Sequence, residues 1–175
     1  MRQFQTAFRK YIFLLIVFAM GCNADLSTKQ WAEARLKYKV AIEVFPRFLD
    51  FTYVENPAVA FGMLRHINEQ VRLPLIFTLT TLAVLFVVFL FWQWRQKKIT
   101  ELLPLALILA GAAGNLTDRI NNGYVIDFIH VHYRYQYNFY VFNIADMLVF
   151  CGVCWLMYQH WQQPKDFYGS RTDIK

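Results

Sequence analysis

Apolar residues are concentrated in four stretches of this chain, and most of the charges lie between them. The stretches cover Tyr11–Ala24, Leu73–Trp94, Ile99–Leu116 and Val141–Trp161. A helix needs about 20 largely apolar residues to cross the hydrocarbon core of a bilayer. The second and fourth stretches reach that length, and the third is slightly short. The first is long enough only if its helix continues from Asp25 to Trp31. The pattern therefore predicts an all-α membrane protein.

The predicted architecture is a single four-helix membrane domain over residues 1–161, with transmembrane helices at about 11–31, 73–94, 99–116 and 141–161. Four spans leave the segments 32–72 and 117–140 together on one side. Within the first segment, residues 40–53 mix Val, Ile, Phe and Thr with charges and predict a small β element. Phe61–Arg72 predicts a short amphipathic helix on the membrane surface. Gly123 predicts a turn, and residues 162–175 predict a loose polar tail.

Composition and charge support a membrane protein and set its orientation. Hydrophobic residues make up 57% of the chain and charged residues 17%, far from the average of soluble domains. The formal charge is +6, but no basic stripe with interleaved aromatic residues is present, so nucleic acid is not an expected partner. Lysines and arginines divide evenly between the two sides. Those on the side of the termini lie close to the membrane in short segments, which predicts that both termini are cytoplasmic.

The N-terminal segment allows a second interpretation. Basic residues precede a short apolar run that ends at Ala19-Met20-Gly21-Cys22, which looks like a lipoprotein signal peptide with Cys22 as the lipidated residue. Three further apolar stretches downstream favour a retained span instead. Cys151 and Cys154 form a C-x-x-C inside an apolar run. No thioredoxin-like βαβ pattern surrounds them, so we interpret them as two small residues on one helix face.

Charged residues at membrane depth are costly and are therefore functional candidates. Four acids meet this criterion at the predicted membrane boundary: Asp25, Asp118, Asp127 and Asp146. Neither of the two serines lies in a G-x-S-x-G setting, and no H-E-x-x-H is present, which argues against serine and zinc proteases. His130 and His132 form an H-x-H near Asp127. A metal site there is conceivable, although such histidines are more often surface residues.

Paired carboxylates supply a chemistry that needs no metal or organic cofactor. Two carboxyl groups held close together cannot both ionise cheaply, so one keeps a proton. The ionised group can take a proton from water while the protonated group polarises a peptide carbonyl. The acids of this chain therefore point to peptide hydrolysis without a covalent intermediate.

Five sequence blocks make the interpretation specific. In chain order they are Asp25-Leu26-Ser27-Thr28-Lys29, Asn56-Pro57-Ala58-Val59-Ala60-Phe61, Gly114-Asn115-Leu116-Thr117-Asp118-Arg119, Gly123-Tyr124-Val125-Ile126-Asp127-Phe128-Ile129 and Phe142-Asn143-Ile144-Ala145-Asp146. Any one block alone is a weak signal. Together, in order and spacing, over about residues 8–160, they closely resemble the type II signal peptidase family, the lipoprotein (prolipoprotein) signal peptidases.

The resemblance implies an activity and a set of site residues. The activity is that of an intramembrane aspartyl endopeptidase of the bacterial cytoplasmic (inner) membrane, which cuts diacylglyceryl-modified prolipoproteins just before the lipidated cysteine. The implied catalytic residues are Asp127 and Asp146. Supporting or substrate-binding positions are Asn56, Asn115, Asp118, Arg119 and Asn143, and Asp25 with Lys29 forms a structural pair. Asp118 either fixes Arg119 or ends its helix. The implied partners are prolipoproteins, membrane lipids and globomycin-like inhibitors, and a monomer is expected.

Some features depart from the family pattern or leave alternatives open. Pro57 and Ala58 stand where the family has a small polar residue and a glycine. The tyrosines from Tyr133 to Tyr140 are not part of the family pattern, and their one expected role is anchoring at the membrane interface. Asp127 could instead cap a helix, and Asp146 could be a buried polar contact. At the level of function, the alternatives are a small transporter with a proton relay of intramembrane acids and a lipoprotein modified at Cys22.

Overall fold

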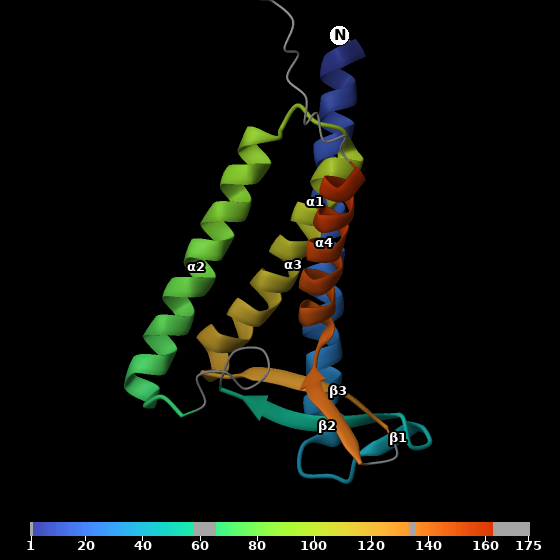
Figure 1. Cartoon of the computed structure of the whole chain (residues 1–175), viewed down its shortest axis with the longest axis vertical. Coiled ribbons are helices and arrows are strands. Elements are labelled where there is room, and N and C mark those ends of the chain that lie inside the picture. Colours follow the sequence, from blue (N-terminus) through green and yellow to red (C-terminus); the bar gives the residue numbers. More distant parts are fainter. Residues whose placement is uncertain (1, 58–65, 134–135, 163–175) are drawn as a thin grey trace, which may run out of the picture.

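Four helices stand on a small sheet in this protein (Figure 1). The computed structural model describes residues 2–57, 66–133 and 136–162. The helices are α1 (Arg2–Leu36), α2 (Glu69–Gln93), α3 (Ile99–Asn122) and α4 (Ile144–Gln162). The strands are β1 (Ile42–Phe45), β2 (Leu49–Asn56), β3 (Val125–Tyr133) and β4 (Tyr137–Phe142). The chain thus alternates between a helical layer and one sheet at its end.

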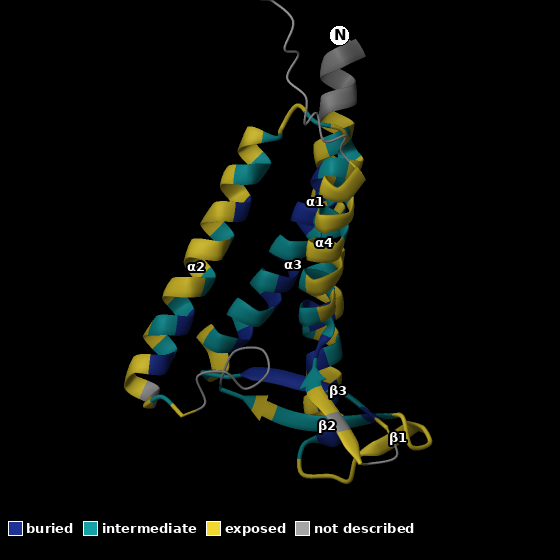
Figure 2. Cartoon of the chain, in the orientation of Figure 1, coloured by how far each residue is buried: buried dark blue, intermediate teal, exposed yellow. Residues whose placement is uncertain are grey.

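Helix α3 is the centre of the helical layer, since it packs against α1, α2 and α4. The apolar core there contains Leu14 of α1, Val87 of α2, and Leu102, Leu105 and Ala106 of α3. Outside this core, α2 is exposed along much of its length (Figure 2). Its outward side chains are large and apolar, among them Leu82, Phe86 and Trp92. Such a surface is stable in a bilayer and costly in water.

Three helices among the described residues are long and apolar enough to cross a membrane: Phe8–Leu36, Gln70–Gln93 and Ile99–Asn122. The first confirms that the N-terminal helix continues past Ala24. The fourth predicted span, α4, does not reach the same hydropathy. It is 19 residues long, with Asp146 in its first turn and His160 in its last. The described structure therefore supports a mostly helical membrane protein with three candidate spans.

The sheet is antiparallel, with the strand order β1-β2-β3-β4. The β element predicted over residues 40–53 is present as β1 and most of β2. Strands β3 and β4, from the segment 117–140, were not predicted. In the β2–β3 ladder, Asp50 lies opposite His130, Val54 opposite Asp127 and Asn56 opposite Val125. This register brings Asn56 beside Asp127, although 71 positions of the chain separate them.

Several predicted boundaries were wrong. Helix α3 continues beyond Leu116 to Asn122 and ends at Gly123, whose φ of 80° is the left-handed conformation that commonly ends helices. Helix α4 begins at Ile144, because Val141 and Phe142 still pair with β3. Of the predicted interfacial helix, residues 61–65 lie outside the described residues, and residues 66–68 are not helical. Its last four positions, from Glu69 on, form the first turn of α2.

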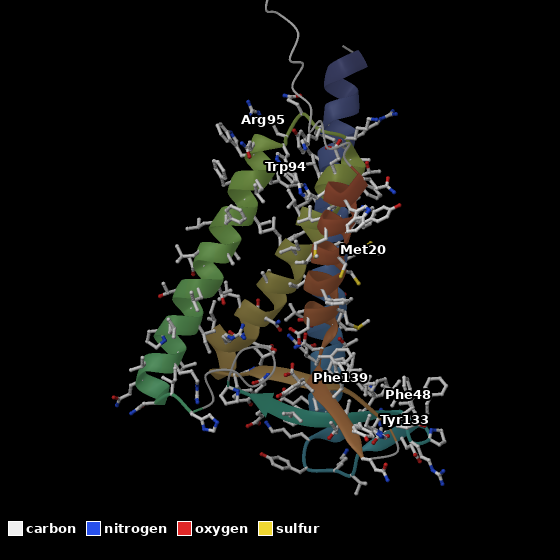
Figure 3. The ribbon with its side chains drawn as sticks, viewed as in Figure 1. Met20, Phe48, Trp94, Arg95, Tyr133 and Phe139 are labelled. Carbon is white, nitrogen blue, oxygen red and sulfur yellow. The ribbon has the colours of Figure 1, made fainter. Side chains whose placement is uncertain are left out.

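Two basic segments, one near the N-terminus and one in the α2–α3 connection, lie at the same end of the molecule. The Lys10 ammonium donates to the backbone oxygens of Arg95 (2.7 Å) and Lys97 (3.2 Å). The Tyr11 hydroxyl donates to the Arg95 oxygen at 2.9 Å. Figure 3 shows Trp94 and Arg95 at this end, with Tyr133 and Phe139 at the sheet end. The N-terminal helix and the α2–α3 connection therefore share one side, opposite the sheet.

Candidate functional site

The four candidate acids meet where α1, α3 and α4 approach β3. Asp25 comes from α1, Asp118 from α3, Asp127 from β3 and Asp146 from the first turn of α4. The exposed fractions of Asp25, Asp118 and Asp127 are only 0%, 5% and 2%. Asp146 is half-buried. Hydrogen bonds and ion pairs divide these acids into two pairs with different surroundings.

Asp25 and Asp118 share one lysine, and we call Asp25, Lys29 and Asp118 the lysine cluster. The Lys29 ammonium lies 2.7 Å from Asp25 Oδ2 and 2.9 Å from Asp118 Oδ2. It also donates to Asn115 Oδ1 at 3.0 Å. Lys29 is only 1% exposed, so its charge is balanced within the protein. Buried charges of this kind are tolerated when they are paired and hydrogen-bonded.

Backbone groups complete the lysine cluster. The Ala145 N–H donates to Asp25 Oδ1 at 2.8 Å, and the Ile126 N–H donates to Asp118 Oδ2 at 3.0 Å. Gly114 makes room for this arrangement, because a Cβ at that position would collide with Asp25 Oδ2. The lysine cluster thus joins α1 and α3 to the start of α4 and to β3.

Asp127 and Asp146 form the second pair, which we call the aspartate pair. Asn56 Nδ2 donates to Asp127 Oδ2 at 2.8 Å, and Asn143 Nδ2 donates to Asp127 Oδ1 at 2.6 Å. Asn115 Nδ2 donates to Asp146 Oδ1 at 2.8 Å. These three donors to the aspartate pair are neutral amides, whereas the lysine cluster contains a cation.

Asn143 connects the two members of the aspartate pair. Its side-chain Oδ1 accepts from the Asp146 N–H at 2.9 Å, and its own N–H donates to Asp146 Oδ2 at 3.3 Å. This reciprocal arrangement resembles a capping box at the start of α4. The same asparagine holds Asp127 through Nδ2. One residue thus fixes both carboxyl groups with respect to each other.

The electrostatic surroundings give the two aspartates different preferences. Burial and, to a smaller extent, the neighbouring charge of Asp146 raise the pKa of Asp127, while the bonds from Asn56 and Asn143 lower it, and the net result is a pKa of about 7. Asp146 lies at the N-terminus of α4, where the helix dipole favours negative charge. The arrangement therefore favours a proton on Asp127.

Arg119 adds positive charge near the aspartate pair. It lies one residue beyond Asp118 on α3 and is close enough to interact electrostatically with Asp146 and Asp127. Its Nη1 donates to the Asn115 oxygen at 3.4 Å. An arginine stays charged in proteins and offers several donors. It can offset negative charge on the pair or on a bound peptide.

The structure brings the sequence-predicted residues into one connected region and corrects three details. Asp118 does not end its helix, and its observed partners are Lys29 and the Ile126 N–H. Asp127 does not cap a helix, because it lies within β3. His132, predicted as a surface residue, is only 2% exposed. The backbone donors Ile126 and Ala145 were missed, since backbone donors leave no signal in side-chain patterns.

Comparisons with known proteins agree with the resemblance drawn from the five blocks. A family model described as signal peptidase (SPase) II matches residues 15–162. A lipoprotein signal peptidase of Syntrophotalea carbinolica is 36% identical over 149 residues, covering 85% of this chain and 91% of the relative. One from Clostridium tetani is 40% identical over 144 residues, covering 82% and 88%. One from Acinetobacter baumannii is 40% identical over 149 residues, covering 81% of each.

Two solved structures, each described as a bacterial membrane enzyme studied by the in meso method, share the fold. One has a TM-score of 0.75 at 24% identity and covers 93% of this chain and 94% of the other. The second has a TM-score of 0.71 at 26% identity and covers 86% and 94%. With the family model spanning most of the chain, these likenesses confirm the resemblance: the chain belongs to the signal peptidase II family of membrane proteases.

Proposed function

We propose that this protein is an intramembrane aspartyl endopeptidase that removes signal peptides from diacylglyceryl-modified bacterial prolipoproteins, cutting just before the lipidated cysteine. The observation that carries this proposal is the aspartate pair, held by Asn56, Asn115 and Asn143 at the end of apolar helices. The names of the relatives support the substrate class.

The proposed reaction uses the unequal protonation of the pair. The Asp146 carboxylate takes a proton from a water molecule, and the resulting hydroxide attacks the scissile carbonyl carbon. Asp127 donates its proton to the carbonyl oxygen, which gives a neutral tetrahedral diol. Asp146 then delivers its proton to the leaving nitrogen while Asp127 recovers a proton from a diol hydroxyl. The C–N bond breaks, and both carboxyl groups return to their starting states.

Asn56, Asn115 and Asn143 act as positioning residues in this scheme, because their amides fix each carboxyl group at 2.6–2.8 Å. Arg119 supplies positive charge that offsets the charge of the pair when the peptide approaches. Asp118, Asp25 and Lys29 hold the helices and β3 that carry the pair. No group outside the chain is needed for these steps.

The proposal includes an arrangement in the membrane. The domain of residues 1–161 crosses the bilayer four times, with α4 as the fourth span, and the segment 162–175 is a cytoplasmic tail. Both termini face the cytoplasm of a bacterium, and the sheet lies outside the inner membrane. The substrate enters sideways, with its lipid remaining in the bilayer, and globomycin-like peptides compete for the same site. The enzyme works as a monomer.

The two alternatives have less support. A proton-relay transporter needs acids spaced across the bilayer, whereas the four candidate acids meet at one end of the helices. Cleavage before Cys22 would remove Leu14 from the core with Val87 and Leu102. In addition, the Cys22 thiol lies against the Ala110 oxygen at 3.6 Å. These contacts favour an N-terminal helix that is retained.

The test is cleavage of a diacylglyceryl-modified prolipoprotein by purified protein in detergent or lipid. We expect Asp127→Asn and Asp146→Asn each to lower kcat/KM by about 10³-fold or more, because each removes a proton-transfer group. Asn keeps the size and the hydrogen-bonding capacity of Asp. Glu33→Gln, an exposed acid on α1, is the matched control and should cleave normally.

Each variant should be checked for folding by its thermal unfolding in the same detergent. Near-normal cleavage by either Asn variant would remove that aspartate from the reaction. Full cleavage of an unlipidated prolipoprotein at the same rate would instead contradict the proposed substrate class. The two results can be told apart, because the first concerns the enzyme and the second the peptide.

A further inference from the structure

A second group of ligand-type side chains lies on the sheet, away from the aspartate pair. It contains Asp50 of β2 with His130 and His132 of β3, and we call it the sheet cluster. Each residue offers one ligand atom, and these atoms all lie within 4.8 Å of one another. His132 is 2% exposed and Asp50 is 7% exposed, while His130 is half-buried. The peptidase mechanism uses none of the three.

The strand register explains why these side chains converge. His130 and His132 are two positions apart, so they point to the same face of β3. Asp50 lies directly opposite His130 in the β2–β3 ladder. The backbone is fixed there as well, since the His132 N–H donates to the Phe48 oxygen at 2.9 Å. The cluster is therefore held by two paired strands rather than by a loose loop.

The distances within the sheet cluster fit a shared cation. His132 Nε2 lies 3.0 Å from Asp50 Oδ2, and the two imidazole ring centres are 5.0 Å apart. Ligand atoms about 2.0–2.1 Å from a tetrahedral zinc ion are about 3.3 Å from one another. The distance between His132 Nε2 and Asp50 Oδ2 is thus already close to that between two ligand atoms of one zinc ion. A small movement of the half-exposed His130 would complete it.

An ion pair between His132 and Asp50 accounts for only part of this arrangement. It does not explain why the His130 ring lies tilted against the ring of His132, with 5.0 Å between the ring centres. It also leaves Asp50 Oδ1 buried with no hydrogen-bond partner among the residues that the structure describes. A divalent ion would engage both imidazoles and the carboxylate together. Two histidines and one carboxylate are a common ligand set for zinc, with water in the remaining position.

We propose that Asp50, His130 and His132 bind one divalent transition-metal ion, with Zn²⁺ the best match, on the sheet of this protein. The ligands are borderline nitrogen donors with one hard oxygen, which suit Zn²⁺ better than Mg²⁺ or Ca²⁺. The ion is structural: it links β2 to β3 three residues from Asp127 along β3. Its function is to stabilise the sheet that carries Asn56 and Asp127.

The test uses the full chain, purified with an affinity tag that contains no histidine and stripped of metal with a chelator. Titration calorimetry with Zn²⁺ should show about one ion per chain. His130→Ala and Asp50→Asn should each weaken binding by about 100-fold or more, because the loss of residues that merely support a ligand already costs 10–100-fold. Saturating Zn²⁺ should raise the Tm of the wild type by about 5 °C and that of the variants by much less.

Two matched controls separate this site from other ligands of the chain. His66→Ala removes an exposed histidine, and the Cys151→Ser/Cys154→Ser double variant removes the C-x-x-C of α4. Both should bind Zn²⁺ as the wild type does. Binding that is unchanged in His130→Ala, or that disappears only in the cysteine variant, overturns the proposal. A wild type that shows neither heat of binding nor a shift in Tm also overturns the proposal. None of these outcomes depends on peptidase activity.

Discussion

The two pairs of aspartates in this molecule lie next to each other, but their shielded carboxyl groups are stabilised in different ways. Asp25 and Asp118 are bridged by the ammonium of Lys29 at 2.7 and 2.9 Å. Asp127 and Asp146 receive hydrogen bonds from asparagine amides instead. Both pairs are largely shielded from water, and Asn115 touches both, through Lys29 on one side and Asp146 on the other.

The difference between the pairs is one of charge rather than of hydrogen-bond number. A cation between two carboxylates offsets their negative charge, which makes a stable joint between helices. Amides stabilise a carboxylate but add no charge, so one acid of the second pair keeps its proton. Burial and the charge of Asp146 place that proton on Asp127, with a pKa of about 7. A lysine thus makes one pair structural, and its absence makes the other reactive.

Removing the cation should have the largest effect on stability. We expect Lys29→Met to lower the free energy of unfolding by about 3–5 kcal/mol, because it leaves two buried carboxylates without a positively charged partner. Thermal or denaturant unfolding in detergent measures this loss. Lys37→Met is the matched control. Lys37 lies at the surface, where it pairs with Glu33 at 3.2 Å, so its loss should change the free energy of unfolding much less.

The triple variant Asp25→Asn/Lys29→Met/Asp118→Asn sharpens this prediction. It removes all three charges of the lysine cluster and should recover part of the lost stability, since no unpaired charge stays buried. Equal losses for Lys29→Met and Lys37→Met would show that the cluster does not depend on its cation.

The reactive pair should show the reverse behaviour, with stability gained when an acid is removed. The folded-state pKa of Asp127, about 7, exceeds its ordinary value of 3.8. The folded protein therefore holds a proton that the unfolded chain releases, so stability falls as the pH rises from about 4 through 7. Asp127→Asn should flatten this decline and be more stable than wild type above pH 7, by at most about 4 kcal/mol.

This prediction is measured by unfolding between about pH 3 and 8, roughly one unit beyond each side of the transition. Glu33→Gln, the exposed acid, should retain the wild-type slope. A parallel pH dependence in Asp127→Asn would mean that another group is responsible for the decline.

The smallest effect concerns the pH profile of cleavage. Activity needs one protonated member of the pair, so kcat/KM should fall as Asp127 ionises, with an apparent pKa of about 7. Asn56 donates to the Asp127 carboxylate and lowers its pKa. Asn56→Ala should therefore move the alkaline limb to higher pH, by about one unit.

Asn23→Ala, an exposed amide on α1, is the control for the pH profile and should leave the limb in place. A limb that does not move in Asn56→Ala, or that moves to lower pH, would contradict the assignment of the proton to Asp127. Because the pair titrates as a unit, the profile should be fitted with values for the pair.

The sequence indicated the second pair more clearly than the first. The five blocks together carried the family resemblance, which implied Asp127 and Asp146 as the catalytic residues, and the four-residue spacing of Asp25 and Lys29 predicted their ion pair. The ion pair between Asp118 and Lys29 could not be predicted from local spacing, because it depends on how α3 packs against α1. The backbone donors Ile126 and Ala145 were hidden for a related reason: their contacts are set by the fold.

The errors in the fold have similar physical causes. Strand β3 reads Val-Ile-Asp-Phe-Ile-His-Val-His-Tyr, and its first four residues are all buried. A strand buried on both faces lacks the alternation of apolar and polar residues that identifies half-exposed strands. The end of α3 was placed too early because Asp118 and Arg119 face other parts of the protein, whereas the prediction assumed that the helix ends with its apolar run.

The contact between Gly114 and Asp25 has a consequence for sequence variation. In a saturation library selected for function, position 114 should accept glycine alone, since even the methyl group of alanine would meet Asp25 Oδ2. Gly123 has open space around it but a φ of 80°, so asparagine should survive there while branched residues disappear. The two glycines would thus be required for different reasons: Gly114 because Asp25 occupies the space of a side chain, and Gly123 because the backbone is left-handed there.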